Sequence, residues 1–403
     1  MKKLLSLLSL FSIFALIHHA AAQEKIKSAR QIPILAWEWQ ASSEENTIAR
    51  YREMRASGIT YNFTFFPDVE TMAKVLKIAQ KTGIRMIVFC PELKTDTKKT
   101  VRRFMHNPAV AGYYLNDEPN SRDFPELTEW VKKIRAIDDN HFCYINLLPN
   151  YANEEQLGAK TYREYVNQFI QEVPVKILSF DHYPIVGDSM RENWYENLEI
   201  FSDEARKAGK PFWAFALTLA HGPYPVPTVA ELRLQVYSDL AYGAQGIQYF
   251  RYWTPKDTVW DFHHGPITLD SKRSEVYDRI KLVNKEIKNL SWVFLGAKVV
   301  SIGHTGDTIP LGTKRLMKLP RPIKVLKTKG SGAVVSVLKK GTDTFLVIVN
   351  RDFINAMKLT IDCDSIVKKI LKDGSMIPAN AYTNTMEIDP GDAAIYMWPT
   401  NNN

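Results

Sequence analysis

The sequence predicts a (β/α)8 barrel, an α/β TIM-barrel fold, followed by a small C-terminal β-sandwich. Between residues 32 and 290, short apolar runs alternate with amphipathic helical stretches, at a period of roughly 30 to 40 residues. Eight strand–helix units can be recognised, which is the number that closes a barrel. From about Val299 the helical pattern is replaced by short β-type runs separated by turns. We therefore predict a barrel over residues 23–298 and a β-sandwich over residues 299–403.

Residues 1–22 have the pattern of a bacterial export signal. Lys2 and Lys3 form a basic start, Leu4–Ile17 is apolar, and Ala20–Ala22 supplies small residues for cleavage. The apolar run is too short for a comfortable membrane span. We therefore expect an exported protein, periplasmic or secreted, with no membrane span once the signal is removed.

The predicted barrel strands are short runs rich in β-branched, aromatic and other apolar residues. They cover Ile32–Trp37, Thr60–Phe66, Arg85–Cys90, Gly112–Leu115, Phe142–Leu147, Ile177–Phe180, Phe212–Leu217 and Gly246–Phe250. Parallel strands of a barrel end at one common rim, where barrel enzymes carry their chemistry. The residues that follow these strands are therefore the first candidates for a functional site.

Caps and glycines mark the predicted helices. The main ones cover Ser43–Ser57, residues 68–82, Phe124–Ile137, Tyr162–Val173, Trp194–Ala208, a helix starting at Thr228, and Ser274–Leu290. Asp68 is expected to cap its helix, and Gly83 to end it. Thr228 and Glu231 have the spacing of a capping box, so Glu231 is expected to support a helix end.

The C-terminal segment is predicted as an accessory β-domain. Phe345–Val349 is a buried strand, Lys372–Ser375 is a hairpin signal, and a turn at Asp389–Asp392 precedes Ala393–Trp398. Three cysteines, Cys90, Cys143 and Cys363, give no disulfide framework. We expect free thiols, with a bridge between Cys90 and Cys143 as the alternative in an oxidising compartment.

The run Val110–Pro119 carries the strongest chemical signal. A buried apolar and aromatic run breaks abruptly into Asn116, Asp117 and Glu118 before Pro119. A buried parallel strand that ends in acids fits delivery of a carboxylate to the barrel rim. The alternative is a helix N-terminus carrying acids, which suits Asp117. Glu118 is the stronger candidate for catalysis.

Other predicted strand ends add polar and aromatic side chains to the same rim. They are Trp37, Glu38, Glu92, Asn146, Asp181, His182, Tyr183, Arg251, Tyr252 and Trp253. Carboxylates can supply a proton and a nucleophile or base, while flat rings stack on the apolar faces of pyranoses. With Asn116 and Asp117, this set predicts a carbohydrate ligand.

Other kinds of site have little support in the sequence. The histidines show no metal-type spacing, and the adjacent His263 and His264 would point apart. No G-x-S-x-G elbow and no glycine-rich phosphate loop follows a strand. The formal net charge is +8, but the basic residues are scattered, and the densest run, Lys314–Lys329, is interpreted as a solvated loop. We expect no metal, no cofactor and no nucleic-acid partner, and no motif specifies an oligomeric state.

Three motifs resemble one group of enzymes. Val110–Pro119, Phe180–Pro184 and Ala241–Phe250 resemble barrel glycoside hydrolases of the large retaining clan, most closely β-galactosidase-like proteins of glycoside hydrolase family 42. The resemblance covers most of residues 32–290, and the tail is similar to the C-terminal sandwich that such enzymes often carry. In that clan strand four ends in Asn-Glu-Pro with the glutamate as acid/base. Asn116–Pro119 matches with one residue inserted, which implies this role for Glu118.

The sequence departs from the clan at its nucleophile. The clan places a glutamate at the end of strand seven, but the matching stretch Lys210–Thr218 contains no acid. Glu38 from the first strand, or Asp181 from the sixth, is predicted to replace it; a structural role for Asp181, bonded to loop amides, is the alternative. A carboxyl separation of roughly 6.5–9.5 Å would indicate inversion, and about 5–5.5 Å retention.

These observations give three functional hypotheses. The leading one is an exported glycoside hydrolase with Glu118 as general acid and Asp181 or Glu38 as base or nucleophile. Asn116 and Tyr183 would position sugar hydroxyls, while Trp37 and Trp253 would stack on the sugar. The second is a carbohydrate-binding barrel without hydrolysis, motivated by the missing strand-seven acid. The third is a lyase-like or other non-hydrolytic enzyme for acidic glycans, motivated by the positive charge.

Overall fold

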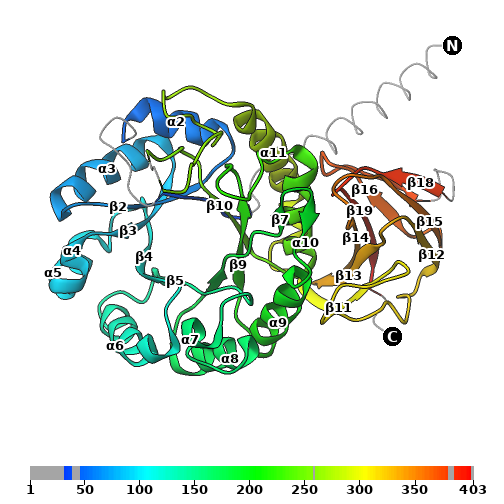
Figure 1. Cartoon of the computed structure of the whole chain (residues 1–403), viewed down its shortest axis with the longest axis horizontal. Helices are drawn as coiled ribbons and strands as arrows, with labels where there is room; N and C mark the ends of the chain where they lie inside the picture. The colour runs from blue at the N-terminus through cyan, green and yellow to red at the C-terminus, as the bar shows by residue number, and fades with distance from the viewer. Residues whose placement is uncertain (1–30, 39–45, 257–258, 380–384, 401–403) are drawn as a thin grey trace, which may run out of the picture.

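The computed structural model describes residues 31–38, 46–256, 259–379 and 385–400. A ring of helices surrounds a parallel barrel, and a β-rich domain lies beside helices α10 (Val229–Ala241) and α11 (Glu275–Phe294), as Figure 1 shows. The predicted signal, residues 1–22, lies outside the described residues. No helix in the described ranges is long and apolar enough to span a bilayer.

The barrel contains eight parallel strands, as the alternating pattern predicts. They are β1 (Ile34–Trp37), β2 (Tyr61–Phe65), β3 (Arg85–Phe89), β4 (Val110–Asp117), β5 (Phe142–Asn146), β6 (Leu178–Phe180), β9 (Phe212–Leu217) and β10 (Gly246–Phe250). Their order is β5-β4-β3-β2-β1-β10-β9-β6. A parallel bridge between Leu147 and Phe180 links the two edges, and the Leu147 amide donates to the Ser179 carbonyl at 2.8 Å. The sheet is therefore a nearly closed TIM-type barrel.

Helices cover the outside of this barrel. Besides α10 and α11 they are α2 (Ile48–Ala56), α3 (Val69–Thr82), α4 (Pro91–Thr95), α5 (Thr97–Phe104), η1 (Ser121–Asp123), α6 (Phe124–Arg135), α7 (Glu154–Leu157), α8 (Tyr162–Glu172) and α9 (Trp194–Lys207). Asp68 caps α3 by accepting from the Thr71 amide at 2.6 Å, and Gly83 ends that helix in the left-handed region. Thr228 and Glu231 form the predicted capping box of α10.

The barrel interior is filled mainly by aromatic rings. Residues alternate along β1, so that Leu35 and Trp37 face inward while Ile34 and Ala36 pack against the helices. Trp37 contacts Phe63 with ring centroids 4.3 Å apart. These large rings close the barrel centre, so the functional rim stands on a rigid base.

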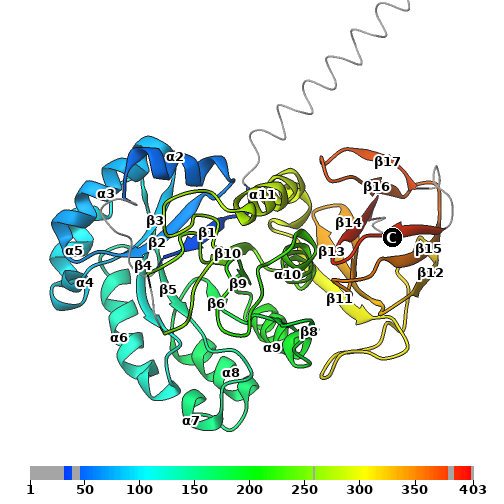
Figure 2. The same ribbon diagram turned by 45° about the horizontal axis from the view of Figure 1, so that its top comes forward.

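The C-terminal domain contains two antiparallel sheets. The larger comprises β11 (Lys298–His304), β13 (Ala333–Lys340), β14 (Asp343–Asn350), β19 (Ala393–Pro399), β16 (Lys368–Ile370) and β17 (Met376–Pro378); the smaller comprises β12 (Ile323–Lys329), β15 (Met357–Cys363) and β18 (Thr385–Ile388). On β14, Phe345 and Val347 join the barrel-helix core, whereas Leu346 and Ile348 face the smaller sheet. The domain therefore packs on the barrel through a shared apolar core, beside α10 and α11 in both views (Figures 1 and 2).

All three cysteines are free, with Cys90 and Cys143 buried. The alternative of a bridge between Cys90 and Cys143 is therefore wrong for this structure. Burial raises the pKa of the Cys90 and Cys143 thiols to about 12. Both remain protonated at neutral pH and pack as small apolar groups.

A buried carboxyl group on α10 gives a prediction about stability. Asp239 is buried, and its Oδ2 has no hydrogen-bond partner in the described ranges. Burial raises its pKa well above the ordinary value. The folded protein therefore keeps a proton that the unfolded chain releases, so stability falls as pH rises above about 4, by up to about 1.4 kcal/mol per pH unit.

Asp239→Asn should remove this contribution to the dependence of the free energy of unfolding on pH. Urea unfolding at a series of acidic to neutral pH values measures that dependence. Asp278→Asn, an exposed substitution on α11, should keep the wild-type slope. Equal slopes for wild type and Asp239→Asn would contradict the assignment of a buried, protonated Asp239.

Candidate active site

Glu118 follows β4 directly, at the carboxyl end of the barrel. Its amide donates to the Asn146 carbonyl at 2.8 Å, so the chain extends the β4–β5 ladder by one bond. The residue adopts φ +49°, in the left-handed region that non-glycine residues rarely enter. Such local strain is found preferentially at functional sites. Its side chain is exposed to solvent at this rim.

Asn146, at the end of β5, forms hydrogen bonds to two further acids at this rim. Its Nδ2 donates to Asp181 Oδ1 at 2.7 Å and to Asp117 Oδ1 at 3.2 Å. The carboxyl groups of Glu118 and Asp181 lie close enough for each to shift the pKa of the other. Asp117, Glu118 and Asp181 therefore form one group, which we call the carboxyl cluster.

A network inside the barrel fixes Asn146. The Ser179 hydroxyl donates to Asn146 Oδ1 at 2.8 Å, so Nδ2 must face the acids. Gln248 Nε2 donates to Ser179 Oγ at 2.9 Å, and the Tyr144 hydroxyl bonds both Ser179 and Gln248. Strands β5, β6 and β10 thus hold the amide that orients Asp117 and Asp181.

Burial raises all three pKa values, and like charge raises those of Asp117 and Asp181 further. Crowding by the surrounding protein raises the pKa of Glu118. The interaction with the Asp181 side chain lowers this pKa, but by less. Burial raises the pKa of Asp181 well above its usual range, and the charges of Glu118 and Asp117 add to this. For Asp117, burial and the Glu118 charge raise the pKa to about 7. No ion pair within the described ranges neutralises these acids, so the cluster retains protons near neutral pH.

Glu38 lies apart from this cluster in a different environment. It is fully buried, and Oε1 accepts from the amides of Tyr252 and Trp253 at 2.7 and 3.1 Å. Its Oε2 accepts from Arg251 Nε at 3.1 Å. Glu38 and Arg251 therefore tie β1 to the chain after β10, which favours Asp181 over Glu38 as the partner of Glu118.

The tryptophans predicted as sugar platforms are buried. Trp37 packs inside the barrel against Phe63, Tyr114, Tyr144 and Phe215. Trp253 and Tyr252 are buried behind the rim, where Trp253 contacts Tyr51. A buried ring cannot stack on a sugar, so the stacking roles expected for Trp37 and Trp253 do not fit this structure.

The remaining predicted residues lie near Asp181 or on β4. His182 is buried, and burial together with the Arg191 charge lowers its pKa to about 3, so it is neutral. Tyr183 is buried against Phe215 and Phe250. Asn116 is half-buried at a register shift between β4 and β5. Asn116 is therefore the more accessible of the two residues predicted to position hydroxyls.

Three rim residues were not predicted from the sequence, because they lie in loops beyond the strand ends. Tyr151, Arg191 and Tyr224 follow β5, β6 and β9 respectively. The Arg191 guanidinium lies 4.7 Å from the Tyr151 ring centroid and 5.9 Å from that of Tyr224. Crowding raises the pKa of Tyr151, and the charges of Asp181 and Glu118 raise it further. Tyr151 also contacts His182, which follows Asp181, with ring centroids 5.0 Å apart, so these side chains lie beside the carboxyl cluster. Their position on loops that follow strands is the signal that could have found them.

The end of β9 carries no acid. Thr218 follows the strand, its amide bonds the Phe250 carbonyl, and its hydroxyl donates to the Arg251 carbonyl at 2.9 Å. The next residues, Leu219 and Ala220, are buried. No group of three metal-ligating side chains occurs in the described part of the chain. Chemistry at this rim would therefore rest on the carboxyl cluster.

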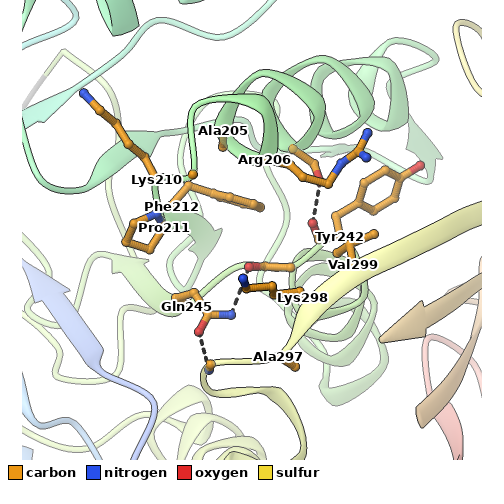
Figure 3. A pocket seen from close by; sticks show the side chains of 14 residues that line it. Ala205, Arg206, Lys210, Pro211, Phe212, Tyr242, Gln245, Ala297, Lys298 and Val299 are labelled. Atoms are coloured by element: carbon orange, nitrogen blue, oxygen red, sulfur yellow. Dashed lines mark hydrogen bonds between the residues drawn. The ribbon is translucent and has the colours of Figure 1, made fainter. Parts of the chain in front are cut away.

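A pocket of about 370 Å³ lies at the opposite end of the barrel (Figure 3). Phe212 and Gln245, at the amino-terminal ends of β9 and β10, line it together with Arg206, Lys210 and Lys298. The Gln245 amide bonds neighbouring backbone groups, including the Gly296 amide at 2.6 Å. The pocket is separate from the carboxyl cluster, and we assign the chemistry to the rim on the basis of its acids.

Comparisons with known proteins agree with this class of barrel. Residues 126–290 match the sequence model of glycoside hydrolase family 42, described as "Beta-galactosidase". The match begins after Glu118 and includes Asp181. No curated protein matches the chain in sequence.

Solved structures show the same fold. A family 42 β-galactosidase from G. stearothermophilus aligns with TM-score 0.63 and 9% identity, covering 92% of this chain and 99% of its own. The β-galactosidase from Bacillus circulans sp. alkalophilus aligns with TM-score 0.60 and 9% identity, covering 91% of this chain and 99% of that one. The alignment with a β-galactosidase from Marinomonas ef1 has TM-score 0.48 and 12% identity and covers 65% of this chain and 60% of that one, so this chain spans less than two thirds of that enzyme.

The resemblance to glycoside hydrolase family 42 predicted from the motifs is confirmed by the family match over residues 126–290. The solved structures share the predicted barrel fold. The match supports the predicted glycosidase class.

Proposed function

We propose that the protein hydrolyses a glycosidic bond, with Glu118 as general acid and Asp181 as its carboxylate partner. The observation that carries this proposal is that Asn146 bonds both the Glu118 backbone and the Asp181 carboxylate, which places the two acids together at the rim where barrel enzymes act. Glu118 is exposed and has a raised pKa, as a proton donor to a leaving oxygen requires. We further propose export, on the basis of the pattern in residues 1–22.

The spacing favours a nucleophilic role for Asp181. The Glu118 and Asp181 carboxyl groups interact directly, which favours a separation shorter than the roughly 6.5–9.5 Å that inverting enzymes leave for a water molecule. In the reactive state the pair would hold one proton, carried by Glu118 toward the leaving oxygen, while Asp181 would be ionised and face the anomeric carbon. Retention of configuration is the expected outcome.

A second candidate function is carbohydrate binding without hydrolysis. Asp181 is only 9% exposed and bonded to Asn146, and β9 ends without an acid. A structural Asp181 would leave Glu118 without a catalytic partner. Binding of a glycan that the wild-type protein never hydrolyses would favour this candidate.

The pH dependence of hydrolysis tests the role of Glu118. Because crowding raises its pKa above the usual 4.5, kcat/KM should persist above that pH and fall as Glu118 loses its proton. The profile can be measured with a nitrophenyl β-galactoside, and a basic limb at or below pH 4.5 would contradict a raised pKa for Glu118.

A further inference from the structure

Arg191 lies at the rim in the segment after a short hairpin of β7 (Ile185–Val186) and β8 (Ser189–Met190). Its amide donates to the Pro184 carbonyl at 2.7 Å, which fixes the backbone close to the end of β6. The guanidinium lies near the rings of Tyr151 and Tyr224, and Nη2 donates to the Tyr224 hydroxyl at 3.1 Å. The side chain is therefore held in one place before any ligand arrives.

The charge of this arginine is not neutralised. Arg191 forms no ion pair within the described ranges. Its Nε is buried and has no hydrogen-bond partner there. A buried guanidinium N–H without an acceptor is costly, and charged groups inside proteins are normally paired. The guanidinium therefore carries a positive charge without an anionic partner in the described ranges.

Arg191 is close to the carboxyl cluster without being paired to it. The Tyr151 ring contacts His182, the neighbour of Asp181, with ring centroids 5.0 Å apart, and the Arg191 guanidinium lies 4.7 Å from the same Tyr151 ring. No ion pair joins Arg191 to Glu118 or Asp181 in the described part of the chain. A sugar reaching from the cluster across Tyr151 would bring its substituents to the guanidinium.

We propose that Arg191 binds an anionic substituent, a carboxylate or a sulfate ester, on the sugar that the carboxyl cluster acts upon. This inference rests on the proposed function for the position of the sugar. Arginine presents planar, paired N–H donors that match a carboxylate or sulfate group. The raised pKa values of Asp117, Glu118 and Asp181 reduce the negative charge that would repel such a ligand.

Binding of matched acidic and neutral sugars tests this proposal. D-Galacturonic acid, D-glucuronic acid and galactose 6-sulfate would each be compared with the parent hexose by calorimetry on the full-length protein. At least one acidic sugar should bind more tightly than its parent hexose. Arg191→Gln should raise the Kd of that acidic sugar by roughly 10- to 100-fold and leave the Kd of the parent hexose unchanged. The uronates and the sulfated sugar distinguish carboxylate from sulfate recognition.

Two variants control for general effects. Arg321→Gln removes the same charge from an exposed site in the C-terminal domain and should leave every Kd unchanged. Tyr224→Phe keeps the ring but removes the hydroxyl that bonds Arg191, and should weaken only the acid. The proposal would be overturned if every acidic sugar had the same Kd as its parent hexose, or if neither sugar of any pair bound. It would also be overturned if Arg191→Gln bound the acidic sugar as tightly as the wild-type protein does. Acid binding through Arg191 without hydrolysis of any glycoside would instead refute the proposed function alone.

Discussion

Glu118→Gln should lower kcat/KM for an aryl glycoside by roughly 10²- to 10⁴-fold, the usual contribution of a general acid. Glutamine keeps the size of the side chain but cannot deliver a proton to the leaving oxygen. The Glu118 backbone bond to Asn146 does not involve the side chain, so the fold should be retained. Activity and thermal unfolding, measured on the same preparation, check both expectations.

Glu92→Gln provides a matched control at the same end of the barrel. Glu92 follows β3, and its Oε1 accepts from the Val69 amide at 3.3 Å, at the start of α3. An amide oxygen can take over that bond, so activity should remain near wild type. Full activity of Glu118→Gln, or equal losses in both variants, would be incompatible with the role assigned to Glu118.

The largest expected effect on stability is at the junction of the barrel and the C-terminal domain. Glu286 on α11 accepts from Arg233 on α10 at 2.5 Å and from the Tyr237 hydroxyl at 2.9 Å. Lys372 of the C-terminal domain lies 3.5 Å from Glu286. Asp392 also pairs with both cations, 3.7 Å from Arg233, so Glu286→Ala would leave Arg233 and Lys372 to share one carboxylate and should cost about 1–3 kcal/mol in the free energy of unfolding.

Urea unfolding of Glu286→Ala can be compared with that of Glu129→Ala. Glu129 pairs with Lys132 at 2.9 Å, but both side chains are exposed, so its loss should cost about 0–1 kcal/mol. Similar small losses in both variants would show that the junction does not depend on the buried charges.

The fold could be predicted because its pattern is local. Each barrel strand is a short apolar run followed by a helix with recognisable caps, such as Asp68 and the pair Thr228–Glu231. The predicted boundary near Val299 remains a prediction; in the structure α11 ends at Phe294 and β11 begins at Lys298.

The site could be predicted only in part. Strand ends locate Glu118, Asp181 and Asn146 at one rim, because parallel strands share their direction. Sequence position does not reveal where a side chain points, and so Trp37 was expected at the surface although it faces the barrel interior. The burial of Glu38 could not be predicted either, because its ion-pair partner Arg251 is distant in sequence. Arg191 and Tyr224 could not be found from strand ends, because loop geometry brings them to the rim.

The most direct test of the central claim compares two leaving groups. Phenyl β-galactoside needs protonation of its leaving oxygen, whereas 2,4-dinitrophenyl β-galactoside departs without it. If Glu118 is the general acid, Glu118→Ala should lose most of its kcat/KM on the phenyl glycoside and little on the dinitrophenyl glycoside. Equal losses on the two substrates would contradict general acid catalysis by Glu118, and wild-type protein that binds both without turning over either would favour carbohydrate binding as the function.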